Sequence, residues 1–167
     1  GDTDSHVASL SVFDDGSGAA LYVAGGFQVA GGVVDGVVSP GVARYDGSSW
    51  SAVGGGKEGL FGGTAVHDDG SGPALYACGG FSSAGGQPAS GIARYRNGAW
   101  SNLNGGSTGS VYAMTVWDDG TGPALYVGGA FTAIGGVSAN SLARWTSCRC
   151  YANCDSSTAA PVLNVND

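Results

Sequence analysis

The chain is poor in charged residues, and positive charge is the scarcest. Its 167 residues include only 6 Lys and Arg against 13 Asp and Glu, which gives a formal net charge of −7 at pH 7. Nucleic acids and anionic membranes are bound through clustered Lys and Arg side chains. The composition therefore argues against both kinds of partner.

Long hydrophobic runs and histidine clusters are also missing. The apolar runs are a handful of residues long, whereas a membrane-spanning helix needs roughly 20, so we expect no membrane span. Only 2 His are present, and they share no spacing with Ser, Asp or Cys that is typical of a hydrolase or metal site. The sequence therefore favours a protein that is not an enzyme.

Glycine, in contrast, is abundant. The chain has 33 Gly, against a usual share of about 7%. An interior glycine costs a helix about 1 kcal/mol, which argues against a helical protein. A hydrophobic fraction of 43% argues against a disordered one. We predict an all-β chain of short strands and tight turns.

An internal repeat organises the chain. The segment at 13–27 returns at 67–81 and 117–131, and the block at 41–50 returns at 91–100 and, in shorter form, at 141–145. The period is about 50 residues. The first repeat is longer, with extra residues within Val33–Pro40. A repeat of this kind fixes the architecture before any local pattern is considered.

Each repeat predicts four strands. The first ends in alternating apolar residues and enters an Asp-Asp-Gly-Ser/Thr-Gly hairpin, here called the DDG turn. The second is Leu-Tyr-Val/Ala closed by a Gly pair, and the third is Ala-Arg-Tyr/Trp. The fourth begins at Trp50 or Trp100. Four antiparallel strands in about 50 residues match one propeller blade.

The Gly-Gly, Tyr and Trp pattern resembles the kelch repeat. More closely, it is similar to a repeat of planctomycete-type secreted proteins, and distantly to the propellers of fungal cortical polarity markers. This resemblance implies blades at about 7–60, 61–110 and 111–147 within a domain at 1–147. Three blades do not close a ring of four to eight. We therefore expect a fragment of a larger β-propeller, with further blades upstream.

Each repeat also carries two aspartates in its DDG turn and one arginine in its third strand. Adjacent carboxylates suggest a metal site or an acid/base dyad, but a feature present in every repeat is more typical of turn chemistry. The arginines suggest either a substrate-binding ring or a repeated ion pair with a turn carboxylate. We expect the structural ion pair, formed by Arg44, Arg94 and Arg144 with Asp14, Asp68 and Asp118.

Other repeated side chains are expected in the core. Aromatic residues at equivalent places fill the space between blades more often than they bind sugars; these are Tyr22, Tyr76, Tyr126, Phe27, Phe81 and Phe131. His67 takes the place of Phe13 and Trp117 at the end of a strand. Cys78 aligns with Ala24 and is expected to be a small buried residue.

The composition changes after Trp145 into a short, irregular, cysteine-containing tail at 148–167. Cys148, Cys150 and Cys154 give only three of the four ligands of a structural zinc site, so a disulfide in an exported protein is favoured. The tail resembles a truncated dockerin-like module with an EF-hand-type calcium loop. The resemblance implies five Ca²⁺ ligands: Asn153, Asp155, Ser157, Asn164 and Asp167.

Inserted residues and the stop at Asp167 depart from the calcium-loop pattern. We therefore expect Ca²⁺ binding of the complete tail domain, with poor affinity in this chain. The alternative interpretation is a disordered polar tail. An anchoring partner for the tail follows from the resemblance.

Together these features predict a non-catalytic, extracellular or cell-surface binding or structural β-propeller with an anchoring or sorting tail. Its ligand would be a protein or a carbohydrate of unknown identity. The variable loop offers the ligand-contacting residues, because loops carry binding functions; they are Val33, Val34, Asp35 and Val37. The alternative is a fragment of a carbohydrate-active or oxidative propeller enzyme with catalytic residues in missing blades.

Overall fold

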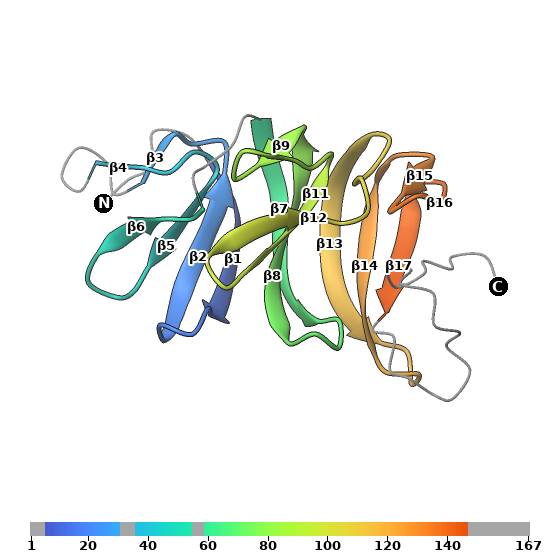
Figure 1. Ribbon diagram of the computed structural model, residues 1–167, viewed down its shortest axis with the longest axis horizontal. Coiled ribbons are helices and arrows are strands. Elements are labelled where there is room, and N and C mark those ends of the chain that lie inside the picture. The colour runs from blue at the N-terminus through green and yellow to red at the C-terminus, as the bar shows by residue number, and fades with distance from the viewer. Residues whose placement is uncertain (1–5, 31–35, 55–58, 147–167) are drawn as a thin grey trace.

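The computed structural model describes residues 6–30, 36–54 and 59–146, and all the regular elements in these ranges are β-strands (Figure 1). All strand pairs are antiparallel. The predicted all-β, antiparallel class is therefore confirmed. No helix in the described ranges is long and apolar enough to cross a membrane.

Three main sheets follow one another along the chain, and none of them closes on itself within the described residues. The first has the order β1 (Val7–Asp14), β2 (Ala19–Gly25), β5 (Val42–Tyr45) and β6 (Trp50–Ala52). The second contains β7 (Gly59–Asp68), β8 (Pro73–Phe81), β11 (Ile92–Arg96) and β12 (Ala99–Asn102). The third contains β13 (Ser110–Asp118), β14 (Pro123–Ala130) and β17 (Leu142–Thr146).

The four strands predicted for each repeat are present in the first and second sheets. The third sheet has three strands within the described residues. The strands of each main sheet lie in chain order, and a tight DDG turn joins the first strand to the second. In Figure 1 the three sheets stand side by side, from blue through green to orange, with the DDG turns at the lower edge.

A small hairpin that the sequence interpretation did not include separates the second and third strands of each repeat. These hairpins are β3–β4 (Val29–Ala30 with Val37–Val38), β9–β10 (Ser83–Ala84 with Gln87–Pro88) and β15–β16 (Ala133–Ile134 with Val137–Ser138). In β9–β10, Gly85 and Gly86 form the two-residue loop with φ of 58° and 75°. Left-handed φ at both loop positions defines the type I′ turn, for which glycine is favoured.

A β-bulge lies in the first strand of each repeat, opposite the glycine pair that closes the second strand. In the third sheet the register shifts between Val111 and Ala113. A Cβ atom on Gly129 would collide there with the carbonyl oxygen of Ser110 and lie 2.7 Å from the Cα of Val111. Glycine at this position therefore admits the bulged backbone of the neighbouring strand.

The second sheet is buried on both faces, which explains why its central strand is a continuous apolar run. Along β8, Leu75 and Ala77 belong to the core shared with the first sheet, while Tyr76 and Cys78 belong to the core shared with the third. The neighbouring strands β1 and β13 both contact β7. The middle repeat therefore holds the other two together.

The two cores between the sheets contain four of the repeated aromatic residues, Tyr22, Tyr76, Phe81 and Phe131. Phe27 is instead buried in a separate cluster on the first sheet, and Tyr126 is only partly buried. Between the first and second sheets, the Tyr22 and Tyr95 rings lie 6.2 Å apart, and the Trp100 indole donates a hydrogen bond to the Val53 carbonyl oxygen. Between the second and third sheets, Trp145 and Phe131 are 4% exposed. Burial of such side chains contributes about 1.5–3 kcal/mol each, so these cores fix how the sheets stack.

Candidate functional site

The first aspartate of each DDG turn closes the turn through backbone hydrogen bonds. In the second repeat, Oδ1 of Asp68 accepts the amide hydrogens of Gly70 at 2.8 Å and Gly72 at 2.9 Å. Asp14 and Asp118 make the same two bonds in their own turns. These aspartates act like the Asx turns that initiate tight loops.

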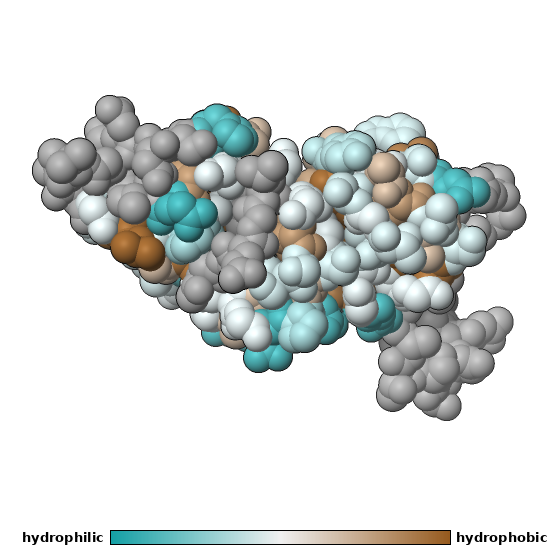
Figure 2. Space-filling model, turned by 90° about the horizontal axis from the view of Figure 1, so that it is seen from above, coloured by the Kyte–Doolittle hydropathy of each residue, from teal (hydrophilic) through white to brown (hydrophobic). Residues whose placement is uncertain are grey.

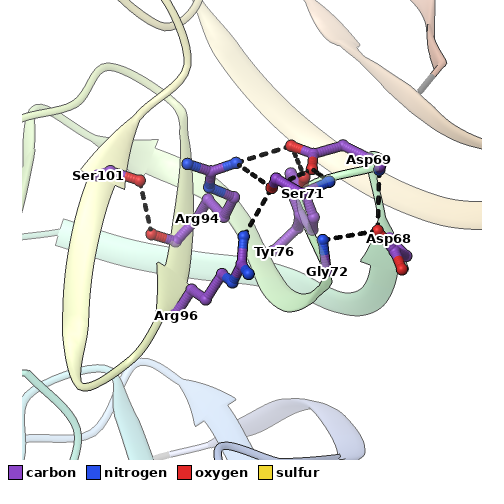
Figure 3. A network of polar contacts seen from close by, with 9 residues as sticks. Asp68, Asp69, Ser71, Gly72, Tyr76, Arg94, Arg96 and Ser101 are labelled. Atoms are coloured by element: carbon purple, nitrogen blue, oxygen red, sulfur yellow. Dashed lines mark hydrogen bonds and ion pairs between the residues drawn. The ribbon is translucent and has the colours of Figure 1, made fainter. Parts of the chain in front are cut away.

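The second aspartate of each turn accepts hydrogen bonds from side chains, and Figure 3 shows these contacts in the second repeat. Oδ1 of Asp69 accepts the Ser71 amide at 3.0 Å and its hydroxyl at 2.5 Å, and Oδ2 accepts the Tyr76 hydroxyl at 2.9 Å. Arg94, from β11, donates to Oδ2 at 2.7 Å. Arg96, two residues further along β11, reaches the same turn and donates to the Ser71 hydroxyl at 2.7 Å.

The other two repeats contain the same set of residues, but the distance between the arginine and the second aspartate differs. Arg144 lies 3.3 Å from Asp119 and donates to the Thr121 hydroxyl at 2.5 Å. Arg44 lies 4.0 Å from Asp15 and donates to the Ser17 hydroxyl at 2.9 Å. The pair between Arg94 and Asp69 is therefore the shortest of the three.

The structure corrects the partners predicted for the arginines. The sequence interpretation paired Arg44, Arg94 and Arg144 with the first aspartates of the turns, Asp14, Asp68 and Asp118. Each arginine instead pairs with the second aspartate, Asp15, Asp69 or Asp119. The physical reason is that the first carboxylate turns back onto the loop amides, whereas the second faces the third strand.

Electrostatics at the second aspartate keep it ionised. Burial alone would raise the pKa of Asp69, but hydrogen bonds from Ser71 and Tyr76 and the charge of Arg94 together lower it. The pKa of Tyr76 is raised, first by burial and then by the Asp69 charge. A neutral phenol bonded to a carboxylate is stable under these conditions, so the network does not exchange protons near neutral pH.

The two carboxylates of one turn serve different partners, one the loop backbone and the other Tyr, Ser/Thr and Arg side chains. Within the described residues, no three His, Cys, Asp or Glu side chains come together as a metal-binding group. The DDG turns thus hold the second and third strands in register at this end of each sheet.

The opposite end of the sheets carries the small hairpins and a hollow of about 490 Å³. This hollow lies where β8 ends, β11 begins and β13 begins, between the second and third sheets. Its lining consists of Gly79, Gly80, Phe81, Ser82, Ser90, Gly91, Gly109 and Ser110. Figure 2 shows this end of the molecule from above, and much of its surface has the pale colours of residues that are neither strongly polar nor strongly apolar.

The lining of the hollow is rich in hydrogen-bonding groups without charge. Gly91 and Gly79 are tied to each other by a backbone bond of 3.0 Å, and Gly91 also donates to Phe81 at 2.9 Å. The Ser107 hydroxyl bonds the carbonyl oxygens of Ser90 and Gly109 beside the hollow. These contacts fix the backbone around the hollow. Volumes of this size are typical of small-ligand sites.

The predicted ligand loop is described only in part. Val37 lies in β4, paired with Ala30 at the hairpin end of the first sheet. Val33, Val34 and Asp35 lie outside the described residues. The five predicted calcium ligands of the tail, and the cysteines at 148, 150 and 154, also lie outside them.

His67 and Cys78 occupy the core between the second and third sheets. His67 is 4% exposed, its ring lies 5.9 Å from that of Tyr76, and its Nε2 has no hydrogen-bond partner. Burial lowers its pKa, against the opposing charges of Asp69 and Asp68. Cys78 is fully buried, and burial raises the pKa of its thiol to about 12. The prediction that Cys78 is a small buried residue is confirmed, and His67 is as buried as Phe13, whose place it takes.

Sequence reasoning misses two groups of residues. The second aspartates of the DDG turns, Asp15, Asp69 and Asp119, carry a signal that would identify them, because a Tyr follows each of them seven residues later and a Ser or Thr two residues later. The serines around the hollow carried no such signal. Ser82, Ser90 and Ser110 come from three different segments and meet only through the packing of the second and third sheets.

Comparison with known proteins gives no relatives. No family model matches the chain, and neither a curated protein nor a solved structure matches it. The candidate site therefore stands on its geometry.

Proposed function

We propose that the chain is a non-catalytic binding module, built from successive β-propeller blades and working outside the cell or at its surface. The blade interpretation is supported by the order of strands in the first and second sheets and by the neighbouring first strands, β1, β7 and β13. In propellers, sheets repeat radially in this way about a common axis. The extracellular setting rests on the repeat and tail patterns in the sequence.

One observation carries the binding role: the hollow between the second and third sheets has no titratable side chain in its lining. Serine hydroxyls and backbone groups suit a neutral ligand with many hydroxyl groups, so we place a carbohydrate there. The DDG turns at the other end are occupied by their own network. The ligand surface is therefore the hairpin end, including the loop with Val37.

A substitution at Gly80 tests this site. Gly80 is exposed on the lining, and among the described side chains a Cβ there would meet only the Ser110 hydroxyl, at 3.5 Å. The third repeat has Ala130 at the equivalent position, so the fold accepts a side chain here. Gly80→Gln should fill the hollow and leave the melting temperature within a few degrees.

The measurement is binding to a panel of neutral polysaccharides, followed by calorimetry with those retained. Ala99→Gln is the matched control, because Ala99 is exposed next to the turn at Asn97 and Gly98, away from the hollow. Binding lost in Gly80→Gln and kept in the control supports the site. Equal binding by both variants, or capture only of a protein in place of a polysaccharide, would contradict it.

The tail at 148–167 adds an anchoring or sorting role to the proposal, supported by its oxygen-bearing side chains in calcium-loop order. Calcium titration of the whole chain, compared with Asp155→Asn, checks this part separately. Weak binding that the substitution removes supports a calcium loop. Binding unaffected by the substitution would contradict it.

A further inference from the structure

The two outer faces of the three-sheet stack expose large apolar side chains. On the first sheet, Leu10 and Val12 are 60% and 69% exposed. On the third sheet, Trp117 and Leu142 are 59% and 51% exposed. Large exposed apolar side chains on one face of a sheet mark a candidate interaction surface.

The repeat shows what these faces are built to contact. Trp117 is equivalent to Phe13 and His67, which are buried between sheets at 4% exposure each. Leu142 is likewise equivalent to Val42 and Ile92, both 1% exposed. The outer face of the third sheet therefore repeats a surface that the first two sheets each press against the following sheet.

The outer face of the first sheet repeats the opposite surface. Val12 is equivalent to Val66, which packs against the core between the first and second sheets. Leu10 is equivalent to Thr64 and Met114, which each face the preceding sheet. Every sheet thus has one face for the preceding sheet and one face for the following sheet.

Side chains that face each other across the two internal contacts between sheets complement each other in polarity and size. Thr64 bonds the Ser9 and Ser11 hydroxyls of the first sheet, both at 2.8 Å. Met114, a larger apolar residue, is matched by Gly63, where a Cβ would lie 3.8 Å from the Met114 side chain, and by Ala65 in the same core.

The two outer faces would allow the same packing of a large apolar side chain on small ones. The positions of the third sheet equivalent to Gly63 and Ala65 are Ala113 and Thr115, and both are exposed. Leu10 is the residue that would lie on them if a first sheet were placed after the third. A large apolar side chain would then again meet small side chains, with Trp117 and Leu142 covered.

We propose that two copies of this chain bind head to tail, with the third sheet of one copy packed on the first sheet of the other. The contact would continue the two internal contacts between sheets. A heterologous contact leads to a closed ring if its rotation closes and to open chains if it does not. This self-association goes beyond ligand binding and does not depend on it.

Sedimentation velocity over a wide range of protein concentration tests the proposal. The whole chain of 16.3 kDa should associate as concentration rises. Leu10→Asp and Trp117→Asp, each in a single face and each at an exposed position, should both remain single chains. Val38→Asp, at a position 69% exposed on the small β3–β4 hairpin, is the matched control and should associate like the parent.

Mixing the two variants separates head-to-tail binding from other arrangements. Leu10→Asp retains an intact third sheet and Trp117→Asp an intact first sheet, so the mixture should form pairs containing one copy of each. A parent chain that stays monomeric at all concentrations overturns the proposal. So does a Leu10→Asp variant that still pairs with itself, because that result means that like faces meet.

Discussion

The salt bridge between Arg94 and Asp69 is the best-formed of the three and sits where it is partly shielded from water. The Arg94 and Asp69 side chains are 30% and 9% exposed. Exposed ion pairs contribute little, but removal of a donor from a buried carboxylate leaves part of its bonding unmet. The second repeat is therefore the place where this network should matter most for stability.

Arg94→Ala should lower the free energy of unfolding by about 1–2 kcal/mol, because Asp69 loses its charged partner. Thermal unfolding followed by circular dichroism measures this. Arg96→Ala is the control, since Arg96 is on the same strand and bonds the Ser71 hydroxyl of the same turn. Equal melting temperatures for the Arg94 variant and the parent would contradict the structural role of the pair.

His67 destabilises the core between the second and third sheets, because its Nε2 atom is buried without a hydrogen-bond partner. Its folded pKa is lowered, chiefly by burial, so the unfolded chain takes up a proton more readily than the folded one. Stability should therefore fall as the pH drops below about 6.5, the ordinary pKa of histidine.

His67→Phe restores the aromatic residue that the first repeat has at Phe13. It should raise the free energy of unfolding by about 1 kcal/mol by removing an unsatisfied buried polar atom, and should flatten the pH dependence between about 5 and 6.5. Urea unfolding at several pH values provides the measurement. If the free energy of unfolding changes with pH in that range as steeply in His67→Phe as in the parent, His67 does not take up a proton on unfolding.

Among single elements, one glycine at the end of the second strand is required by the bulge opposite it, as Gly25 is in the first repeat and Gly129 in the third. Gly129→Ala should cost roughly 1–3 kcal/mol, as overpacking does, because the new Cβ would collide with the Ser110 carbonyl oxygen. Gly80→Ala is the comparison, with only ordinary contact to the Ser110 hydroxyl at 3.5 Å. Denaturant unfolding of both variants measures the loss of unfolding free energy. A similar loss in Gly129→Ala and Gly80→Ala would contradict the bulge explanation.

A prediction for the molecule as a whole concerns the core between the second and third sheets. These two sheets should separate from each other cooperatively. Cys78 lies fully buried in this core with a thiol pKa of about 12, and the thiolate is the reactive form. A thiol reagent should therefore label Cys78 only under conditions that separate the second and third sheets. Peptide mapping by mass spectrometry distinguishes Cys78 from the other cysteines. Rapid labelling in the native state would contradict this packing.

Local signals along the chain are enough to predict the main strands, the DDG turns and the period of the repeat. Alternating apolar residues and the DDG turns are local signals, because hydrogen bonds within a few residues fix them, and the predicted main strands accordingly appear in the first and second sheets. The small hairpins had a local signal too, in Gly85 and Gly86, but strands of two residues are too short for an alternating pattern.

Which residues come into contact depends on how the strands and sheets pack in space. The two aspartates of a turn are adjacent and chemically identical in the sequence, and just the position of the neighbouring third strand selects Asp69 over Asp68 for Arg94. The hollow and the two exposed apolar faces likewise depend on how whole sheets stack. Stacking is set by burial of side chains far apart in the chain, so the repeat fixes the sheets, while their packing places the candidate site and leaves the outer faces open.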